Sequence, residues 1–411
     1  MNAMAPDRFA RMRGLYAEAV TLAPALRRRF EVAGLLPEQL QDAVALNRLA
    51  VLKKETLLAM QQAEPPFAGF LACRPEEIAH VYVSPGPIFE PSLAEDKGGH
   101  GMDMMFAAAG LGPGDLALNT WSYHLVPAGL LFDRGLRAVG AAVVPGGTGA
   151  SDLQADILLS LPVTAFLGST AFFQTVIERL EQKGHSLPAA WKLRHAFLGG
   201  EFGDWSTKRR HLESCYGIQT WSCYGTADFG LIGYERPGSS DYHIHPERYV
   251  QICDPESGQP LAPGQAGEIV VTTLSRGWPM IRFGTGDVST ALELAADGGA
   301  VRIAPLQGRV GQAVKAREIF IYPSHVDRLP ALVPGLARLA LVVKRPGSRD
   351  EITARILPTA DVDATIVAAQ LRAAFPGVTR LQLDHVELLA DAGAFGDAPP
   401  LCDARHAVVS S

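Results

Sequence analysis

The chain has 411 residues, of which 47% are hydrophobic and 19% charged, with a formal net charge of −6. This length fits two or three domains of roughly 100–200 residues each. The small charge is spread along the chain, which argues against a nucleic-acid partner, and the sequence has no uncharged apolar run of the roughly 18 residues that a membrane helix needs. The five cysteines are odd in number and widely spaced. This spacing excludes a disulfide framework and a CxxC zinc pattern, and we expect a cytoplasmic protein.

The first half of the chain predicts helices followed by alternating strands and helices. In residues 7–62, apolar side chains recur every three or four positions, as in Leu36, Leu40 and Val44, which indicates amphipathic helices. From about 78 to 235, short β-branched runs alternate with helical stretches. Such alternation is typical of βαβ units and a mainly parallel sheet.

The second half predicts a change of architecture. Glycine and proline punctuate extended runs in residues 243–305, which indicates a small antiparallel or barrel-like region. Strand-like runs around a helix near 362–375 then suit a compact α+β domain. The expected fold is therefore α/β, with a large N-terminal domain over 1–309 of mostly parallel sheets with helices. It includes the β-rich subdomain, and a small mobile α+β domain follows over 312–411.

The generic phosphate motifs, GxxxxGK[ST] and a strand-placed GxGxxG, are missing from the sequence. In their place, the loop SPGPIFEP follows a predicted strand. Ser84 and the backbone of Gly86 are able to face an anion there, although Pro85 and Pro87 remove two amide donors. A rigid turn without a ligand is an equally good interpretation of this loop.

The strongest group of candidates lies at two predicted strand ends, over residues 199–202 and 223–228. Ligands of parallel α/β sheets bind beyond the carboxyl ends of the strands. Tyr224 offers a flat face for a purine, Thr226 a hydroxyl for a phosphate, and Asp228 a hard oxygen ligand for Mg²⁺. The alternative is a strand-end turn with a buried tyrosine and a solvated aspartate.

Two further residues complete the candidate site. Asp287 follows a glycine-rich turn, where its carboxylate is able to accept both hydroxyls of a ribose. Arg309 lies at the expected hinge, from which a guanidinium is able to reach a ribose or a phosphate. The TGD sequence alone is a common turn.

Several blocks, taken together, carry a resemblance to a known family. They include HVYVSPGPIFEP, CYGTADFGLIGYE, GEIVVTTL, the block ending FGTGD and the GR…FIYPSHV block. In this order and spacing they resemble the phenylacetate-CoA ligase branch of the adenylate-forming superfamily, from about residue 45 to the end. The resemblance implies attack of a carboxylate on the α-phosphorus of ATP, followed by thiolysis of the acyl-adenylate. It also implies ATP or AMP, Mg²⁺ and CoA or a carrier thiol as ligands, an aryl or related carboxylic acid as substrate, and a homodimer.

The resemblance also implies roles for individual residues. Asp228 assists Mg²⁺, and Thr226 meets the α-phosphate. Together with the loop candidates above, the expected nucleotide-binding residues are Ser84, Gly86, Gly200, Glu201, Phe202, Tyr224, Gly225, Thr226, Asp287 and Arg309. The expected acid-binding residues are Trp121, Tyr123, His124, Ala128 and Gly199. His124 is able to pair with the substrate carboxylate or to be an ordinary histidine at a helix start.

The sequence departs from the family pattern at its lysines. The phosphate loop lacks its lysine, and Asp228 replaces the usual glutamate. Pro399 stands where the family has its catalytic lysine, and no lysine follows Lys344. Losing such a cation commonly costs about 10²–10³ in rate. Lys315 is the candidate substitute, and a solvated surface lysine is the alternative.

Other functions therefore stay open at this point. One is a catalytically weakened homologue that binds a nucleotide, acyl-adenylate or acid without adenylating it. Another is transfer from a preformed activated acid on the same scaffold. His243 and His245, two apart on a strand, also raise a metal site, for which the sequence shows no third ligand.

Overall fold

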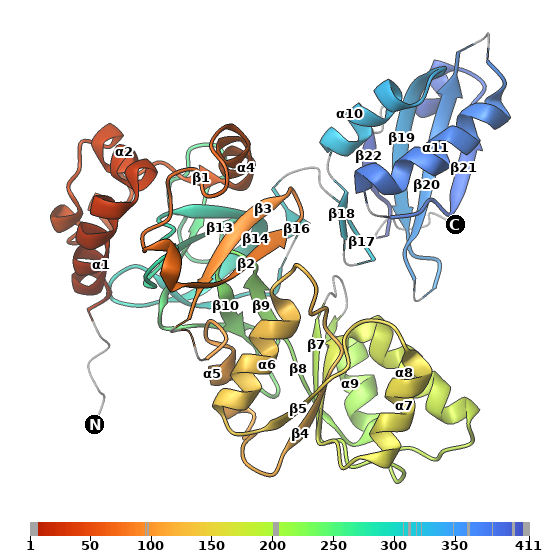
Figure 1. Cartoon of the computed structure of the whole chain (residues 1–411), viewed down its shortest axis with the longest axis horizontal. Helices are drawn as coiled ribbons and strands as arrows, with labels where there is room; N and C mark the ends of the chain where they lie inside the picture. Colours follow the sequence, from red (N-terminus) through yellow and green to blue (C-terminus); the bar gives the residue numbers. More distant parts are fainter. Residues whose placement is uncertain are drawn as a thin grey trace. The chain divides into compact units, whose positions relative to one another are not determined.

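The computed structural model divides into two compact units, Met1–Val310 and Gly311–Ser411 (Figure 1). It describes residues 7–405 except for residues 95, 97, 200–204, 307, 311–313, 318, 322, 348, 360–361, 380 and 397–398. Within this described part, none of the helices combines the length and the apolar character that crossing a bilayer requires. Each unit is described by itself below.

The first unit begins with helices that cover its antiparallel sheet. Asp7 caps the first helix, because its side chain accepts a bond from the Ala10 amide at 3.0 Å. The Tyr16 hydroxyl, which is buried, donates to the Thr273 carbonyl at 3.0 Å and so fixes this helix on the sheet. These helices are α1 (Arg8–Leu22), α2 (Pro24–Val32), α3 (Ala43–Leu46) and α4 (Lys54–Ala63).

A five-stranded parallel sheet, in the order β5-β4-β6-β7-β8, confirms the predicted βαβ alternation. Its strands are β4 (Leu116–Asn119), β5 (Ala142–Pro145), β6 (Ala165–Ser169), β7 (His195–Gly199) and β8 (Gln219–Trp221). Its helices are α5 (Met102–Ala108), α6 (Ala128–Ala138), α7 (Ser151–Ser160), α8 (Thr170–Gln182) and α9 (Trp205–Tyr216), with α5 and α6 on one face and α7 to α9 on the other (Figure 1). Leu167 packs in the core with α5 and α6, whereas its neighbour Phe166 packs with α7 and α8.

The second sheet of this unit has nine strands, and its pairings are antiparallel except between β1 and β14. It comprises β1 (Leu52–Lys53), β9 (Cys223–Thr226), β10 (Gly230–Tyr234), β11 (Tyr242–Ile244), β12 (Arg248–Cys253), β13 (Ala266–Thr273), β14 (Phe283–Leu294), β15 (Ala300–Ile303) and β16 (Gly308–Arg309). A separate antiparallel hairpin joins β2 (Ile78–Ser84) to β3 (Ile88–Leu93).

These pairings correct the sequence prediction in two places. The run over 78–235 is not uniformly parallel, since β2, β3, β9 and β10 pair antiparallel. The antiparallel region is also larger than residues 243–305 alone. The error has two physical reasons. The chain passes from the parallel sheet into the antiparallel one after only a short gap behind β8, and fully buried strands have similar apolar sequences in both kinds of sheet.

The second unit is an α+β fold on a four-stranded sheet, in the order β21-β20-β19-β22. Its strands are β17 (Val314–Ala316), β18 (Ile319–Ile321), β19 (Leu336–Lys344), β20 (Glu351–Pro358), β21 (His385–Leu388) and β22 (Leu401–Asp403), of which β17 and β18 form a hairpin. Its helices are α10 (Pro323–Leu332) and α11 (Ala364–Thr379). Val326, Leu371 and Phe375 from these helices join Leu341 and Ile356 of the sheet in one core. The observed mixture of α/β and α+β architecture confirms the predicted fold class.

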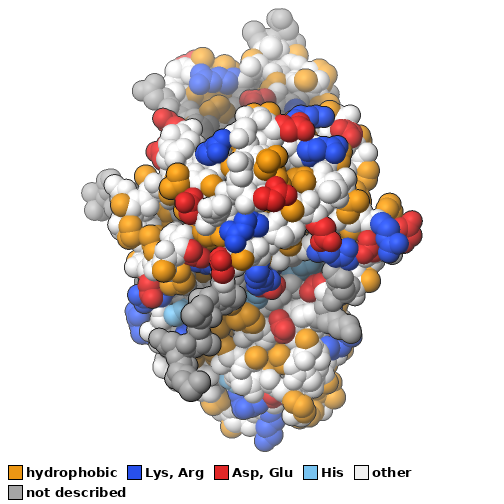
Figure 2. Space-filling model, turned by 90° about the vertical axis from the view of Figure 1, so that its left-hand side faces the viewer, with side chains coloured by type: hydrophobic (Ala, Val, Ile, Leu, Met, Phe, Trp, Pro, Cys, Tyr) orange, Lys and Arg blue, Asp and Glu red, His pale blue; other side chains and the backbone are white. Residues whose placement is uncertain are grey.

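The surface carries mixed charge. On the face seen in Figure 2, lysine and arginine side chains are interspersed with aspartate and glutamate, and apolar side chains lie among them. This agrees with the even spread of charge along the sequence.

Candidate active site

The turn between β9 and β10 gathers three of the sequence candidates, Tyr224, Thr226 and Asp228. The turn is tight: a Cβ on Gly225 would lie 2.5 Å from the Gly230 carbonyl oxygen, so only glycine fits there. Tyr224 is 4% exposed and its hydroxyl donates to Asp287 Oδ2 at 2.9 Å. The position of the Tyr224 side chain is therefore fixed by burial and by this hydrogen bond.

Asp287 also binds Arg309, so that three candidates form one chain of hydrogen bonds. The two residues lie opposite each other on β14 and β16, and Arg309 Nε donates to Asp287 Oδ1 at 2.8 Å. Burial, and after it the charge of Asp287, raises the pKa of the Tyr224 hydroxyl well above its usual value, so Tyr224 remains a donor. Each carboxylate oxygen of Asp287 has a second lone pair, which leaves capacity for a further donor.

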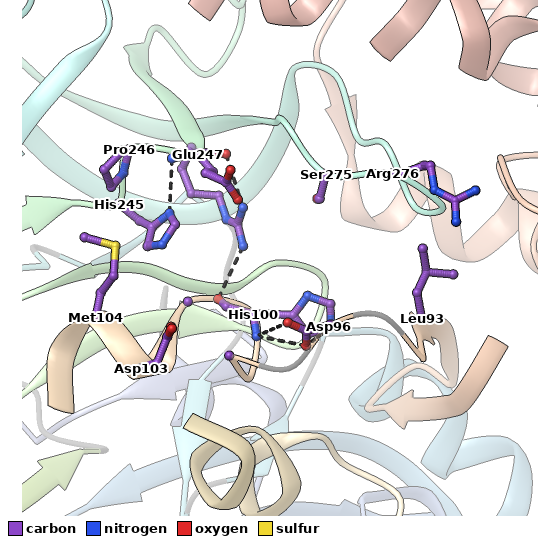
Figure 3. A pocket seen from close by; sticks show the side chains of 13 residues that line it. Leu93, Asp96, His100, Asp103, Met104, His245, Pro246, Glu247, Ser275 and Arg276 are labelled. Carbon is purple, nitrogen blue, oxygen red and sulfur yellow. Dashed lines mark hydrogen bonds and ion pairs between the residues drawn. The ribbon is translucent and has the colours of Figure 1, made fainter. Parts of the chain in front are cut away.

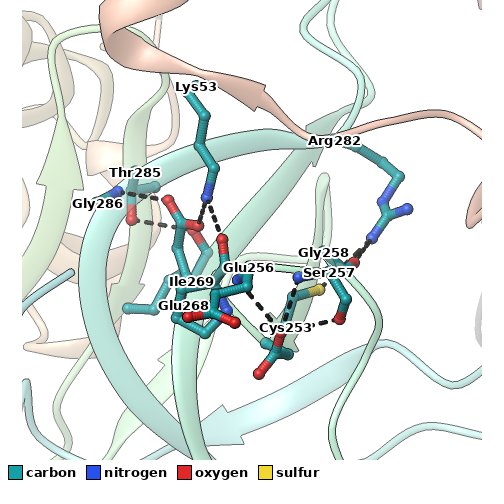
Figure 4. Close-up of polar contacts among 12 residues, drawn as sticks. Lys53, Cys253, Glu256, Ser257, Gly258, Glu268, Ile269, Arg282, Thr285 and Gly286 are labelled. Atoms are coloured by element: carbon teal, nitrogen blue, oxygen red, sulfur yellow. Dashed lines mark hydrogen bonds and ion pairs between the residues drawn. The ribbon is translucent and has the colours of Figure 1, made fainter. Parts of the chain in front are cut away.

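A second layer of contacts fixes the turn that carries Asp287 (Figure 4). Glu268, 2% exposed, forms an ion pair with Lys53 and accepts a bond from the Gly286 amide at 3.1 Å. The Thr285 hydroxyl donates to the Ile269 carbonyl at 3.0 Å and accepts from the Asp287 amide at 3.2 Å. The Asp287 carboxylate is thus positioned by its own backbone before any ligand binds.

The β2–β3 hairpin places Ser84 differently from the expected anion contact. The Ser84 hydroxyl donates to Glu90 Oε1 at 2.8 Å, and both side chains are buried. Gly86 lies in the turn of this hairpin, between β2 and β3. The serine is therefore committed to a carboxylate, and its hydroxyl proton points away from an incoming anion.

Glu90 and Lys54 are site residues that sequence reasoning missed. Glu90 is 1% exposed and lies within hydrogen-bonding range of Asp228, whose Oδ2 is 3.3 Å from the Lys54 ammonium. Burial, and after it the charge of Asp228, raises the pKa of the Glu90 carboxyl well above its usual value. Glu90 lies on the same face of β3 as Ile88 and Ser92, and all three positions are buried in the structure.

Three buried oxygen atoms of this region have no hydrogen-bond partner among the described residues: Glu90 Oε2, Asp228 Oδ1 and Thr226 Oγ1. Orphaned hard oxygens fit the donor set that Mg²⁺ prefers, which is one or two carboxylates with further oxygen ligands. Within the described ranges, no group of three or more histidine, cysteine, aspartate or glutamate side chains is placed to hold a metal ion.

The candidates for the acid pocket lie at the ends of β4 and β7 and at the start of α6. A Cβ on Gly199 would lie 3.3 Å from the Trp121 indole, so these two residues are in contact. The Tyr123 hydroxyl accepts from Asn119 Nδ2 at 2.9 Å and donates to Asp133 Oδ2 at 3.3 Å.

Two further candidates at this edge make no described polar side-chain contact, and three others lie outside the described residues. The His124 side chain is exposed, and Ala128 begins α6. Gly200, Glu201 and Phe202 lie outside the described residues.

The remaining candidates lie in the second unit. Lys315 is on β17 opposite Phe320, and its side chain is outside the described part of the structure. Arg317, the other nearby cation, is occupied: its amide donates to Asp350 Oδ2 at 3.0 Å and its guanidinium pairs with Asp384. Pro399 is exposed, just before β22.

A separate cavity of about 540 Å³ lies in the first unit (Figure 3). The charged and titratable side chains around it are Asp96, His100, Asp103, His245, Glu247, Arg248 and Arg276. Burial lowers the pKa of His245 to about 4, and its Nδ1 accepts a bond from the Glu247 amide at 3.1 Å. His245 is therefore neutral, and its Nδ1 is already hydrogen-bonded within the protein.

Comparisons with known proteins find relatives of this chain, although no family model matches it. The phenylacetate-coenzyme A ligase of Thermus thermophilus is 28% identical over 369 residues, which cover 84% of this chain and 79% of that protein. The phenylacetate-coenzyme A ligase of Escherichia coli is 25% identical over 350 residues, covering 81% and 77%.

Solved structures show the same fold. A crystal structure of 2-hydroxyisobutyryl-CoA ligase, in complex with 2-HIB-AMP and CoA in the thioesterification state, has a TM-score of 0.87 at 24% identity and covers 99% of this chain and 91% of its own. Amide bond synthetase McbA from Marinactinospora thermotolerans has a TM-score of 0.56 at 19% identity, covering 77% and 66%. The resemblance inferred from the sequence motifs is thereby confirmed, and the chain is a relative of the phenylacetate-coenzyme A ligases with the fold of the adenylate-forming acyl-CoA ligases.

Proposed function

We propose that the protein is an AMP-forming acid–thiol ligase. It binds ATP and an aryl or related carboxylic acid, forms an acyl-adenylate and then a thioester of CoA or of a carrier thiol. The chain of hydrogen bonds from Tyr224 through Asp287 to Arg309 carries this proposal, because it joins three residues from three strands into a rigid acceptor and donor set for a ribose. The likeness to the phenylacetate-coenzyme A ligase of Thermus thermophilus, over 84% of this chain and 79% of that protein, supports the same activity.

The chemistry asks the protein mainly for positioning. In the first step a carboxylate oxygen attacks the α-phosphorus of ATP, and the bond to pyrophosphate breaks. In the second step the thiol sulfur attacks the acyl carbonyl, and AMP leaves. Tyr224 would flank the adenine, Asp287 and Arg309 would hold the ribose, and Thr226 would contact the α-phosphate. These contacts would orient the nucleotide for attack, so the loss of its freedom of movement occurs on binding and not in the chemical step.

Mg²⁺ is part of the proposal, with Asp228 as its ligand. The orphaned Asp228 Oδ1 and its turn neighbour Thr226 Oγ1 fit the ion. When bound, Mg²⁺ supplies neutralisation of negative charge on the phosphates. The neighbouring Lys54 contributes a fixed positive charge, which holds the carboxylate in place.

Lys315 is the proposed catalytic cation. Pro399 cannot provide a charge, and Arg317 is held by Asp350 and Asp384. The acid would be bordered by Trp121, Tyr123, His124, Ala128 and Gly199. Of these, Trp121 and Gly199 are in contact with each other. We also propose the domain limits 1–309 and 312–411, a homodimer, a cytoplasmic location, and no membrane or nucleic-acid partner.

The test is pyrophosphate exchange across a panel of carboxylic acids, with calorimetric titration of ATP and AMP on the same protein. The proposal expects exchange with at least one acid and binding of AMP. Binding of AMP or a sulfamoyl acyl-adenylate analogue without exchange would instead identify a weakened homologue. Pro399, at the position of the family's lysine, is the observation that favours this second function. Failure of ATP, AMP and the analogue to bind at millimolar concentration would refute both.

A further inference from the structure

The cavity of about 540 Å³ in the first unit has a size typical of small-molecule sites (Figure 3). Its walls come from the segment between β3 and α5, from the connection between β11 and β12, and from the connection between β13 and β14. Among the described residues that line it, none is a proposed contact of the nucleotide or the acid. The cavity is therefore a candidate site of its own.

Asp103 is a carboxylate in this cavity with no ion-pair partner among the described residues. Burial raises the pKa of its carboxyl, and the like charges of Asp96 and Glu247 act in the same direction. The groups that favour its charge are neutral ones, the backbone amides of Asp103 and Met104. A positively charged ligand group beside Asp103 would therefore be stabilised by it.

The other two carboxylates of the cavity already have partners. Asp96 accepts the His100 amide with both of its oxygens, each at 3.0 Å. Glu247 forms an ion pair with Arg11 of α1 at 2.6 Å. Asp103 is thus the carboxylate that is best placed to receive a cation.

His245 presents a buried donor to the same cavity. Its ring is neutral, and its Nδ1 accepts the Glu247 amide at 3.1 Å, so the proton lies on Nε2. The residue is 6% exposed, and its Nε2–H has no acceptor among the described residues. Leaving a buried donor unsatisfied is costly, which favours a ligand oxygen there. Figure 3 shows Asp103 and His245 on facing walls, at the end of the cavity where Met104 lies.

Two glycines keep these polar groups uncovered. A Cβ on Gly98 would lie 2.8 Å from the Asp103 carboxylate, and a Cβ on Gly101 would lie 2.6 Å from His245 Nε2. Gly101 has a φ of +91°, which favours glycine in any case, but Gly98 is outside the left-handed region. At Gly98, glycine is therefore needed for the clearance over Asp103 and not for the backbone.

We propose that this cavity binds a small organic ammonium compound with a hydroxyl or carbonyl oxygen close to its nitrogen, as in an amino alcohol. The ammonium donates to Asp103, the oxygen accepts from His245 Nε2–H, and the carbon skeleton contacts Met104. One carboxylate facing one N–H suits such a ligand, whereas a metal ion requires a larger cluster, which the described residues do not form. Binding at this site does not depend on the proposed function.

The experiment titrates leucinol into the full chain by calorimetry at neutral pH. Isohexanol lacks the ammonium group of leucinol, and isohexylamine lacks its hydroxyl. Leucinol should bind more tightly than either compound, because it alone satisfies both polar groups. Saturating AMP should leave its affinity unchanged, and displacement by AMP would place leucinol in the nucleotide site and overturn the inference.

Variants assign the binding to individual side chains. Asp103→Asn should weaken leucinol binding by about tenfold or more, since it removes a charge-assisted acceptor. His245→Phe should abolish the preference for leucinol over isohexylamine. Gly98→Ala keeps the charge of Asp103 but covers it with a methyl group, and serves as a second test if Asp103→Asn does not fold. Thermal unfolding shows which variants are folded.

Asp152→Asn is the matched control. Asp152 also lies in the first turn of a helix, α7, but does not line the cavity, and this variant should bind leucinol as the wild type does. Three results would overturn the inference: no leucinol binding, equal binding of leucinol and isohexanol, or equal affinity in the wild type and Asp103→Asn. Failure of AMP to bind in the same samples would count against the proposed function alone.

Discussion

Two neighbouring polar groups of the first unit differ in how their charges are satisfied. Tyr224, Asp287 and Arg309 form one hydrogen-bonded group, called the ribose group here. In the ribose group, each oxygen of the Asp287 carboxylate accepts a hydrogen bond. In the carboxylate pair of Glu90 and Asp228, burial and the charge of Asp228 raise the pKa of the Glu90 carboxyl, so the two groups are joined by a proton on Glu90. The first group is satisfied by donors of the protein, whereas the second depends on a proton taken from solvent.

This difference separates two ways of preparing a site. The ribose group is preorganised, so a nucleotide can bind to these side chains without rearranging them. The carboxylate pair places two acidic groups side by side, and a proton on Glu90 relieves the repulsion between them. Changes in the first group should therefore weaken binding of a nucleotide, and changes in the second should alter the stability of the unliganded protein.

The largest expected effect lies outside both groups. Lys315→Ala should lower pyrophosphate exchange by about 100-fold, because it removes a cation that acts on the developing charge of the transition state. AMP affinity should change little, since the contact is absent from the ground state. Exchange rates and calorimetry on one preparation measure both quantities. Exchange that survives this substitution would show that another cation supports the reaction.

Removing the Asp287 carboxylate from the ribose group should have the next largest effect. Asp287→Ala should weaken AMP binding by about 1–3 kcal/mol, the range for loss of a charge-assisted acceptor. Isothermal titration calorimetry measures the difference. Asp297→Ala, which removes a carboxylate that pairs with Arg8 elsewhere in the unit, is the control. Equal AMP affinity in wild type and Asp287→Ala would take Asp287 out of the site.

The carboxylate pair should respond in the opposite direction. At a pH high enough to ionise Glu90, Glu90→Gln should raise the free energy of unfolding by about 1 kcal/mol, because the amide still donates to Asp228 after the wild-type carboxyl has lost its proton. Urea unfolding over a pH series measures this effect, and the difference between variant and wild type should shrink as the pH falls. A destabilised Glu90→Gln protein would mean that the two carboxylates already have a satisfactory partner.

The smallest expected effect comes from the hydroxyl of Tyr224. Tyr224→Phe keeps the ring but removes the bond to Asp287, and should weaken AMP binding by about 0.5–1.5 kcal/mol. Competition with a fluorescent AMP analogue would measure it. If Tyr224→Phe costs as much as Asp287→Ala, the hydroxyl rather than the carboxylate organises the ribose side.

The general fold was accessible from sequence because hydrophobic periodicity depends on local burial. Phe166 and Leu167 point into different cores on the two faces of one sheet, and such strands read as short apolar runs between helices. The pairing of β9 was not accessible. The strand Cys223–Thr226 follows β8 after one residue, yet pairs antiparallel with β10 in another sheet, and strand pairing depends on contacts distant in sequence.

The candidate site shows the same division. Tyr224, Asp287 and Arg309 were named from motif chemistry, and the structure brings them into contact. Their mutual hydrogen bonds could not be read from spacing, because Tyr224 and Asp287 are 63 residues apart. Glu90 and Lys54 were missed because their meaning comes only from the residue they contact, Asp228, which lies far along the chain from both.

The contacts of Arg317 bear on how motion could be observed in this protein. Arg317 adopts a positive φ of 47° and binds Asp350 and Asp384 through both backbone and side chain, two residues after Lys315. The β17–β18 hairpin is therefore fastened to the body of the second unit. A spin label attached to this hairpin would therefore report displacement of the whole second unit rather than local motion of a loop.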